Sequence, residues 1–177
     1  MQKRYGFTLI ELLIVIGLIA ILAGIVFVAL DPLTRFRDAR NSRRYADVSS
    51  MLTALRVNQV DNQGQYITSV KDLPYALLAD DLRTYMIVDS DTAACITVDI
   101  VLPITGCSPQ ITELRCVSLQ KLSTGGYLGV VPSSPPGDVK WKVDNIYSGY
   151  YLRKKTNGSV TIGACESETA PAIEVTR

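Results

Sequence analysis

The first thirty residues restrict this chain more than any other stretch, because a long apolar run begins beside a single carboxylate. From Leu12 to Leu30, nineteen consecutive residues carry no charge. At about 1.5 Å of rise per residue, a helix of this length approaches the roughly 30 Å hydrocarbon thickness of a bilayer. Glu11 stands at the head of the run, and an ionised carboxylate in hydrocarbon is costly unless it is paired. The sequence therefore predicts a membrane-spanning helix whose carboxylate needs a partner.

The residues around Glu11 resemble the N-terminus of type IV prepilins and type II secretion pseudopilins. A short leader carries Lys3 and Arg4 and ends in Gly6. Phe7 follows, and Glu11 stands four residues further on. In that family a membrane peptidase cuts after the glycine and methylates the new N-terminal residue. The resemblance implies cleavage between Gly6 and Phe7, and N-methylation of Phe7. It also implies that Glu11 pairs with the Phe7 amine of a neighbouring subunit in a helical filament.

Two other interpretations of this stretch fit it less well. A secretory signal peptide has an apolar region of about 7–15 residues, followed by a small-residue cleavage site. Here the run is longer and leads into Asp31-Pro32. A plain single-pass anchor explains the length of the run, but explains neither Glu11 nor the Gly6-Phe7 pair. The prepilin interpretation accounts for all of these features.

We expect residues 31–64 to continue the same helix outside the membrane. Pro32 removes a backbone donor, which predicts a bend near Leu30 and Asp31. Gly64 suits the left-handed position past a helix C-terminus. Apolar or aromatic residues fall at Phe36, Tyr45, Val48, Leu52 and Leu55, and the steps of three and four from Tyr45 onward predict one apolar face. A basic cluster opposite this face is interpreted chiefly as solvated or subunit-facing surface: Arg35, Arg37, Arg40, Arg43 and Arg44. Lipid headgroups are one alternative, and DNA is another that no interleaved aromatic residues support.

Residues 65–177 are predicted to form a globular, β-rich domain. Strands are expected at 85–88, 96–102, 146–154 and 159–164, with the last two joined as a hairpin through Asn157-Gly158. A short helix within 68–84, a helix at 113–122, a strand or extended segment at 127–131 and an extended, partly mobile tail from 166 to 177 complete the prediction. The apolar face of the long helix and the sheet should cover each other. The predicted class is α+β, with one long N-terminal helix packed on an antiparallel sheet, which is the pilin fold.

The four cysteines all follow the membrane run, on the side that such a chain exports. None of them forms a C-x-x-C pair, so a zinc or thioredoxin-like site is weakly supported. An even number in an oxidising compartment favours two disulfides, with buried free thiols as the alternative. Three pairings remain open among Cys95, Cys107, Cys116 and Cys165.

The composition offers little for catalysis or for a cofactor. The chain has no histidine, which removes Ser-His and Cys-His arrangements and imidazole ligands. A net charge of +1 does not indicate a nucleic-acid partner. Asp138, Asp144 and Asn145 could contribute to a calcium loop, but their spacing fits none well, so we expect no metal and no cofactor. Aromatic residues are expected in the core or at subunit contacts rather than in an adhesive patch: Trp141, Tyr147, Tyr150 and Tyr151.

The sequence thus divides into a leader (1–6), a membrane and filament-core helix (7–30), its amphipathic continuation (31–64) and the C-terminal domain (65–177). We expect no enzyme but the structural subunit of a type IV pilus-like filament. Its expected partners are copies of itself, a prepilin peptidase, the membrane before assembly and an assembly machinery. The chain is expected to be a single-pass membrane protein first and part of a surface filament afterwards. A type II secretion pseudopilin and a membrane-anchored binding module are the alternatives.

Overall fold

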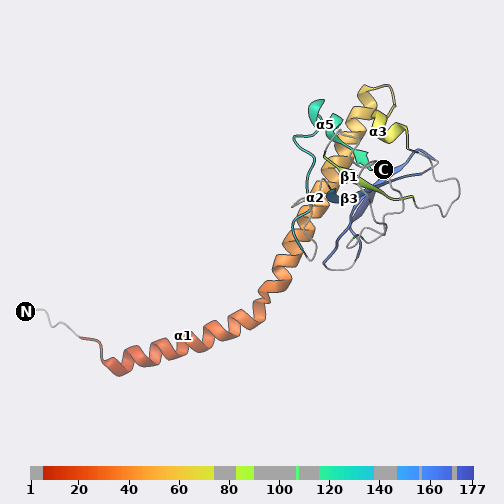
Figure 1. Ribbon diagram of the computed structural model, residues 1–177. Coiled ribbons are helices and arrows are strands. Elements are labelled where there is room, and N and C mark those ends of the chain that lie inside the picture. The colour runs from red at the N-terminus through yellow and green to blue at the C-terminus, as the bar shows by residue number, and fades with distance from the viewer. Residues whose placement is uncertain are drawn as a thin grey trace, which may run out of the picture. The chain divides into compact units, whose positions relative to one another are not determined.

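The structure is a computed structural model that describes residues 6–73, 83–89, 107, 116–137, 147–155, 157–168 and 171–177, without the side chain of Leu30. The chain divides into two compact units, Met1–Asp38 and Ala39–Arg177. Figure 1 shows the elements of both units in order along the chain. The two units are described separately below.

The first unit is dominated by helix α1, which spans Leu9–Leu30. Thr8 caps its N-terminus in an extended conformation, and a side-chain oxygen at this position satisfies one of the backbone donors that a helix start leaves open. The helix ends at Asp31, which adopts a left-handed conformation with φ of 37°. Pro32 follows and begins the next helix, a position where its missing N–H costs nothing. The helix is therefore broken at Asp31, where the sequence predicted a bend.

Helix α2 spans Pro32–Asp61, close to the predicted continuation. Its buried apolar residues recur at steps of three and four, at Val48, Met51, Leu52 and Leu55. The helix ends with a left-handed turn in which the Gly64 N–H donates to the Gln59 carbonyl at 2.8 Å. Gly64 has a positive φ as predicted, but the preceding Gln63 does too. The left-handed turn therefore begins one residue earlier than expected.

The second unit contains a five-stranded sheet with the order β2-β1-β3-β4-β5. Its strands are β1 (Tyr85–Val88), β2 (Val117–Ser118), β3 (Tyr147–Lys154), β4 (Val160–Ala164) and β5 (Glu174–Thr176). All neighbouring pairs are antiparallel except β1 and β2, which are parallel. Gly158, with φ of 82°, turns the predicted hairpin between β3 and β4. The prediction of an α+β, pilin-like arrangement is confirmed.

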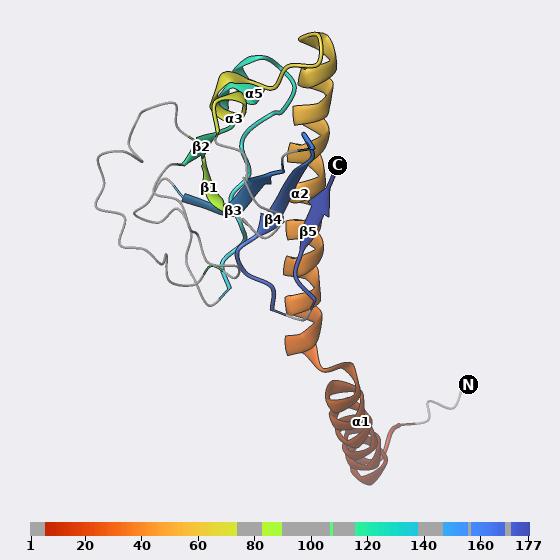
Figure 2. The ribbon, with the colours of Figure 1, turned by 90° about the vertical axis from the view of Figure 1, so that its right-hand side faces the viewer.

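Helix α2 runs along the sheet, and the core lies between them (Figure 2). Val48, Leu52 and Leu55 pack in one cluster with sheet residues such as Tyr85 and Ile162. Each such side chain contributes about 1.5–3 kcal/mol when it leaves water. Two short helices, α3 (Thr68–Lys71) and α5 (Gln120–Thr124), add Val70 and Leu122 to the same cluster. The helix face predicted from spacing is therefore the one that covers the sheet.

Several expectations about this unit need correction. Tyr45 was assigned to the apolar face of the long helix, but its side chain is exposed. The helix expected at 113–122 is only partly right among the described residues, because Val117–Ser118 is strand β2 and α5 begins only at Gln120. Of the strand or extended segment expected at 127–131, the strand does not form. The tail is not simply extended, since Glu174–Thr176 pairs with β4 as strand β5.

The aromatic residues of strand β3 belong to the core, as expected. Tyr150 and Tyr151 are fully buried, while Tyr147 is half-buried. The Tyr150 hydroxyl donates to Asp47 Oδ2 on α2 at 2.6 Å. Burial and this carboxylate together raise the pKa of Tyr150, so its hydroxyl stays a donor. Trp141 and the strand expected at 96–102 lie outside the described residues.

Candidate functional site

The first turn of α1 holds the residues that the sequence singled out. The backbone N–H of Glu11 donates to Thr8 Oγ1 at 3.3 Å, and that hydroxyl donates in turn to Glu11 Oε2 at 3.5 Å. A carboxylate at this position also interacts favourably with the positive end of the helix dipole. Thr8 thus explains locally why the helix starts where it does and keeps the Glu11 carboxylate at its end.

Phe7 and Gly6 precede this turn, outside the helix. The Phe7 side chain is 79% exposed, and a Cβ added at Gly6 would meet nothing within 4 Å. Phe7 and Glu11 therefore lie at the same end of α1, with the bond between Gly6 and Phe7 in open chain. This is the geometry that a peptidase acting on the leader would need.

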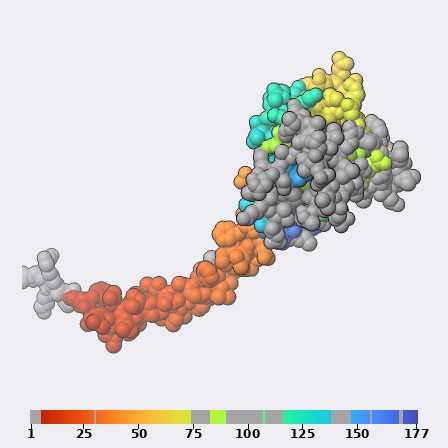
Figure 3. Space-filling model, viewed as in Figure 1, coloured from red at the N-terminus to blue at the C-terminus, as the bar shows by residue number. Residues whose placement is uncertain are grey.

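The rest of α1 is apolar on every side. The stretch Leu9–Ala29 has a mean hydropathy of 3.2 and is long enough to cross a membrane, and none of it is buried within the structure. In Figure 3 its side chains, in red to orange, are open along the face in view. A helix that is apolar all round is stable only in lipid or against other apolar helices. Within the described residues, the N-terminal unit therefore presents an apolar surface that lipid or other apolar helices would have to cover.

The structure tests part of the prediction that the cysteines form two disulfides. Cys107 and Cys165 form a disulfide across a sequence separation of 58 residues. They pack with Met86 and Tyr151 in a second small core cluster. Cys116 is disulfide-bonded as well, and none of the described cysteines is free. Cys95 lies outside the described residues.

A buried arginine on α2 is the feature that the sequence analysis missed. Arg44 was assigned to a solvated face, but its side chain is 0% exposed. Its guanidinium donates to Ser134 Oγ at 3.0 Å, to Glu166 Oε2 at 3.1 Å and to Glu168 Oε1 at 2.7 Å. It also donates to Asn41 Oδ1 at 2.8 Å and to the Pro135 carbonyl at 3.1 Å. All five guanidinium donors are thereby satisfied.

Arg40, one turn earlier on α2, completes this cluster. Its Nε donates to Glu168 Oε1 at 2.7 Å, and its Nη2 pairs with Glu168 Oε2. Hydrogen bonds from Arg40, and next from Arg44, lower the pKa of Glu168 to about 2 against the opposing effect of burial. The two arginines therefore bind the segment after β4 to α2. The spacing of Arg44 with Val48 and Met51 places the three residues on one helix face, and this spacing could have revealed that Arg44 is buried.

No metal site emerges from the part of the chain that is described. Within it, no three histidine, cysteine, aspartate or glutamate residues group together as ligands. Asp138, Asp144 and Asn145, the candidates for a calcium loop, lie outside the described residues.

The comparisons with known proteins single out the same N-terminal stretch. Residues 1–27 match the family model described as the prokaryotic N-terminal methylation motif. No curated protein and no solved structure matches the chain. The motif is typical of type IV pilins and pseudopilins, in keeping with the pilin-like fold. It implies a pilin or pseudopilin that a prepilin peptidase processes and that assembles into filaments, with a structural and not an enzymatic role. The apolar helix α1 is consistent with a membrane-anchored prepilin.

Proposed function

We propose that this chain is the structural subunit of a type IV pilus-like filament, made as a membrane-anchored precursor. The observation that carries the proposal is the position of Glu11 in the first turn of an uncovered, 22-residue apolar helix. Among the described residues, no basic side chain forms an ion pair with Glu11. An acidic group at this place in an apolar surface needs a cation from elsewhere.

Removal of residues 1–6 would create that cation. Cleavage after Gly6 frees an ammonium group on Phe7, and N-methylation leaves the amine basic. Glu11 of one subunit can then pair with the Phe7 amine of the next as their helices pack. A subunit docked out of register would leave both charges desolvated and unpaired, which penalises every wrong position. Glu11 would thus set the axial register of the filament.

The apolar surface of α1 would supply the cohesion of the filament. Side chains such as Leu12, Ile16 and Ile19, each more than half exposed in the single chain, would be covered by the helices of neighbouring subunits. Gly17 and Gly24, where an added Cβ would meet nothing within 4 Å, are places for close helix approach. The unit from Ala39 onward would then form the part of each subunit that carries the disulfides.

A type II secretion pseudopilin is the second candidate. The segment 61–66, in which α2 ends and the left-handed turn follows, resembles the helix-ending segment of major pseudopilins, although Ile67 stands where those often have proline. Deletion of the gene separates the two roles. Loss of long surface fibres supports the pilus-like subunit, whereas loss of protein export without loss of fibres supports the pseudopilin.

An assembly assay tests the role of Glu11. Glu11→Ala and Glu11→Gln are each expressed as the only copy, and precursor, mature monomer and sheared filaments are measured by immunoblot. Both variants should insert and be cleaved, because the run becomes more apolar and Gly6 is kept. Both should assemble poorly, because the carboxylate charge is lost. Asp38→Ala, which removes an exposed carboxylate outside α1, is the matched control and should assemble normally. Normal filament yield from Glu11→Ala would contradict the proposal.

A further inference from the structure

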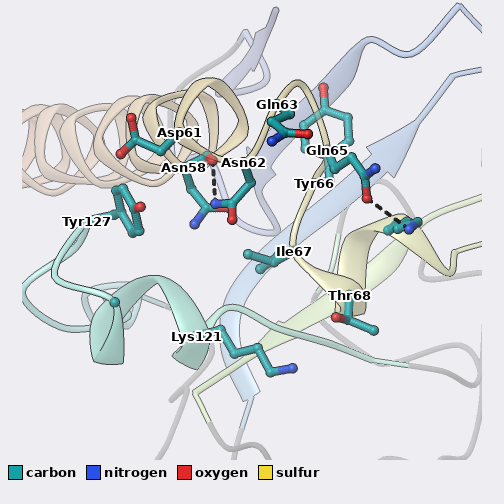
Figure 4. A pocket seen from close by; sticks show the side chains of 12 residues that line it. Asn58, Asp61, Asn62, Gln63, Gln65, Tyr66, Ile67, Thr68, Lys121 and Tyr127 are labelled. Carbon is teal, nitrogen blue, oxygen red and sulfur yellow. Dashed lines mark hydrogen bonds between the residues drawn. The ribbon is translucent and has the colours of Figure 1, made fainter.

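A polar pocket of about 670 Å³ lies at the C-terminal end of α2 (Figure 4). Its volume falls within the roughly 300–1,000 Å³ that is usual for small-molecule sites. The lining comes from separate segments: Asn58 on α2, Gln63 in the turn that follows, Lys71 on α3, Lys121 on α5 and Tyr127 after α5. The fold therefore brings together side chains that are far apart in the sequence, and the function proposed above does not use them.

Four amide side chains contribute hydrogen-bonding groups to this pocket. Asn62 Nδ2 donates to the Asn58 carbonyl at 2.8 Å, and Gln65 Oε1 accepts from Lys71 Nζ at 3.0 Å. These bonds leave the Asn62 Oδ1 and the Gln65 Nε2 available. The Gln63 amide makes no hydrogen bond within the described part of the chain. Each amide offers donors and an acceptor side by side, which is the complement of neighbouring hydroxyl groups.

Asn58 adds a polar atom that lacks a partner. Its side chain is only 6% exposed, and its Oδ1 atom has no hydrogen-bond partner in the described structure. A buried acceptor without a partner is costly and is rare in folded proteins. Because Asn58 lines the pocket, a hydroxyl group entering there could supply the missing donor with a small shift of the side chain. This atom points to a ligand rich in hydroxyl groups.

The charged and aromatic side chains of the pocket restrict the chemical class of the ligand further. The lining contains two lysines, Lys71 and Lys121, and one carboxylate, Asp61, so it carries a net positive charge. In Figure 4 the Lys121 side chain extends from α5 toward α3, and it has no partner within the described residues. Tyr127 offers a ring against which the apolar face of a sugar can pack, whereas the Tyr66 ring already carries the Arg56 guanidinium at 5.7 Å. Hydroxyl groups together with one negative charge describe an acidic sugar.

We propose that this pocket binds an acidic carbohydrate, with Lys121 pairing with a hexuronate carboxylate and the amides with the sugar hydroxyls. An acidic peptide fits less well, because Ile67 is the single aliphatic residue among the described lining residues. The pocket therefore offers little for apolar peptide side chains. The site lies wholly within the unit Ala39–Arg177, so binding requires neither cleavage of the leader nor polymerisation. In a filament, repeated copies would add avidity to weak single sites.

Calorimetric titration of the full-length chain in detergent micelles tests the proposal with three probes. Trigalacturonate supplies both hydroxyl and carboxylate groups, maltotriose supplies hydroxyl groups alone, and triglutamate supplies carboxylates alone. Trigalacturonate should bind at least tenfold more tightly than either of the others. Lys121→Gln should weaken its binding about tenfold, the effect of losing one hydrogen bond to a charged group. Lys155→Gln, at an exposed lysine on the β3–β4 hairpin, is the matched control and should not change it.

Each other outcome overturns the proposal. If maltotriose bound as tightly as trigalacturonate, the carboxylate of the sugar would play no role in binding. Equal binding of triglutamate would identify a peptide site. Absence of binding, or an equal loss in the Lys121 and Lys155 variants, would show that the pocket is not a carbohydrate site. Because Lys121 is exposed and unpartnered within the described residues, its substitution should leave folding intact, which circular dichroism checks. None of these results depends on whether the chain forms filaments.

Discussion

Gly163 on β4 is the register partner of Tyr151 on β3, and the Tyr151 side chain occupies the space that a side chain at 163 would fill. The Tyr151 hydroxyl reaches past Gly163 and donates to Glu174 Oε2 on β5 at 2.9 Å. Glu174 is in turn the register partner of Gly163. The Arg153 guanidinium lies 4.9 Å from the centre of the Tyr151 ring. One aromatic side chain therefore connects three strands, and it does so across a glycine.

Gly163→Ala should destabilise the C-terminal unit by about 1–3 kcal/mol, because the added Cβ would collide with the ring and hydroxyl of Tyr151. Denaturant unfolding of the full-length chain in detergent micelles measures the change. Gly129→Ala is the matched control, since a Cβ there meets nothing within 4 Å. Equal stability of the two variants would mean that Tyr151 moves aside at no cost.

Arg44→Met should destabilise the same unit by about 3–5 kcal/mol. The substitution leaves Glu166 and Glu168 without their buried cation, and breaking a buried pair costs more than the pair itself contributes. Arg43→Met, at an exposed neighbour, should change the free energy of unfolding by less than about 0.5 kcal/mol. Similar losses of unfolding free energy in both variants would show that the buried contacts of Arg44 stabilise the unit no more than an exposed arginine does.

The free energy of unfolding should depend on pH through the ionisation of Glu168. Its pKa is lowered from 4.5 to about 2 in the folded state, so between these values the unfolded chain binds more protons. The contribution of ionised Glu168 to the free energy of unfolding is therefore complete above about pH 4.5 and is lost as the pH falls toward 2. Glu168→Gln should be less stable at neutral pH and should lose part of this acid dependence. Asp72→Asn, at an exposed acid, should keep it, and thermal unfolding from pH 7 to 2 compares the variants.

Peptide mapping without reduction should recover Cys107 joined to Cys165 and no free thiol. We predict that the second bond joins Cys116 to Cys95. Cys107→Ser should lower the free energy of unfolding by about 2–4 kcal/mol, because the unfolded chain loses a long-range constraint. Cys107 found in another pairing, or alkylated in unreduced protein, would count against this arrangement.

Much of this architecture could be predicted because its signals are local. The apolar run, the steps of three and four from Val48 to Leu55, and Asn157-Gly158 each act within a few residues. The spacing of Arg44 with Val48 indicates the buried face of α2, but Arg44 was assigned to solvated surface because other basic residues lie beside it. Its acidic partners, Glu166 and Glu168, lie 122 and 124 residues away.

The C-terminal strand and the polar pocket were missed for a related reason. Glu174–Thr176 has three residues, which is too short for an alternating pattern, and it becomes a strand because β4 offers an unpaired edge. The pocket depends on how the end of α2, α3 and α5 come together. No single segment carries its pattern, so only the folded chain reveals it.

The N-terminal peptide of assembled material tests the central claim most directly. Filaments sheared from cells that express the wild-type chain are digested, and the mass of the peptide that contains Glu11 is measured. The peptide should begin at Phe7 and carry one added methyl group on its amine. An intact Met1, or an unmodified N-terminus at any other residue, would contradict a processed pilin-type subunit held in register by Glu11.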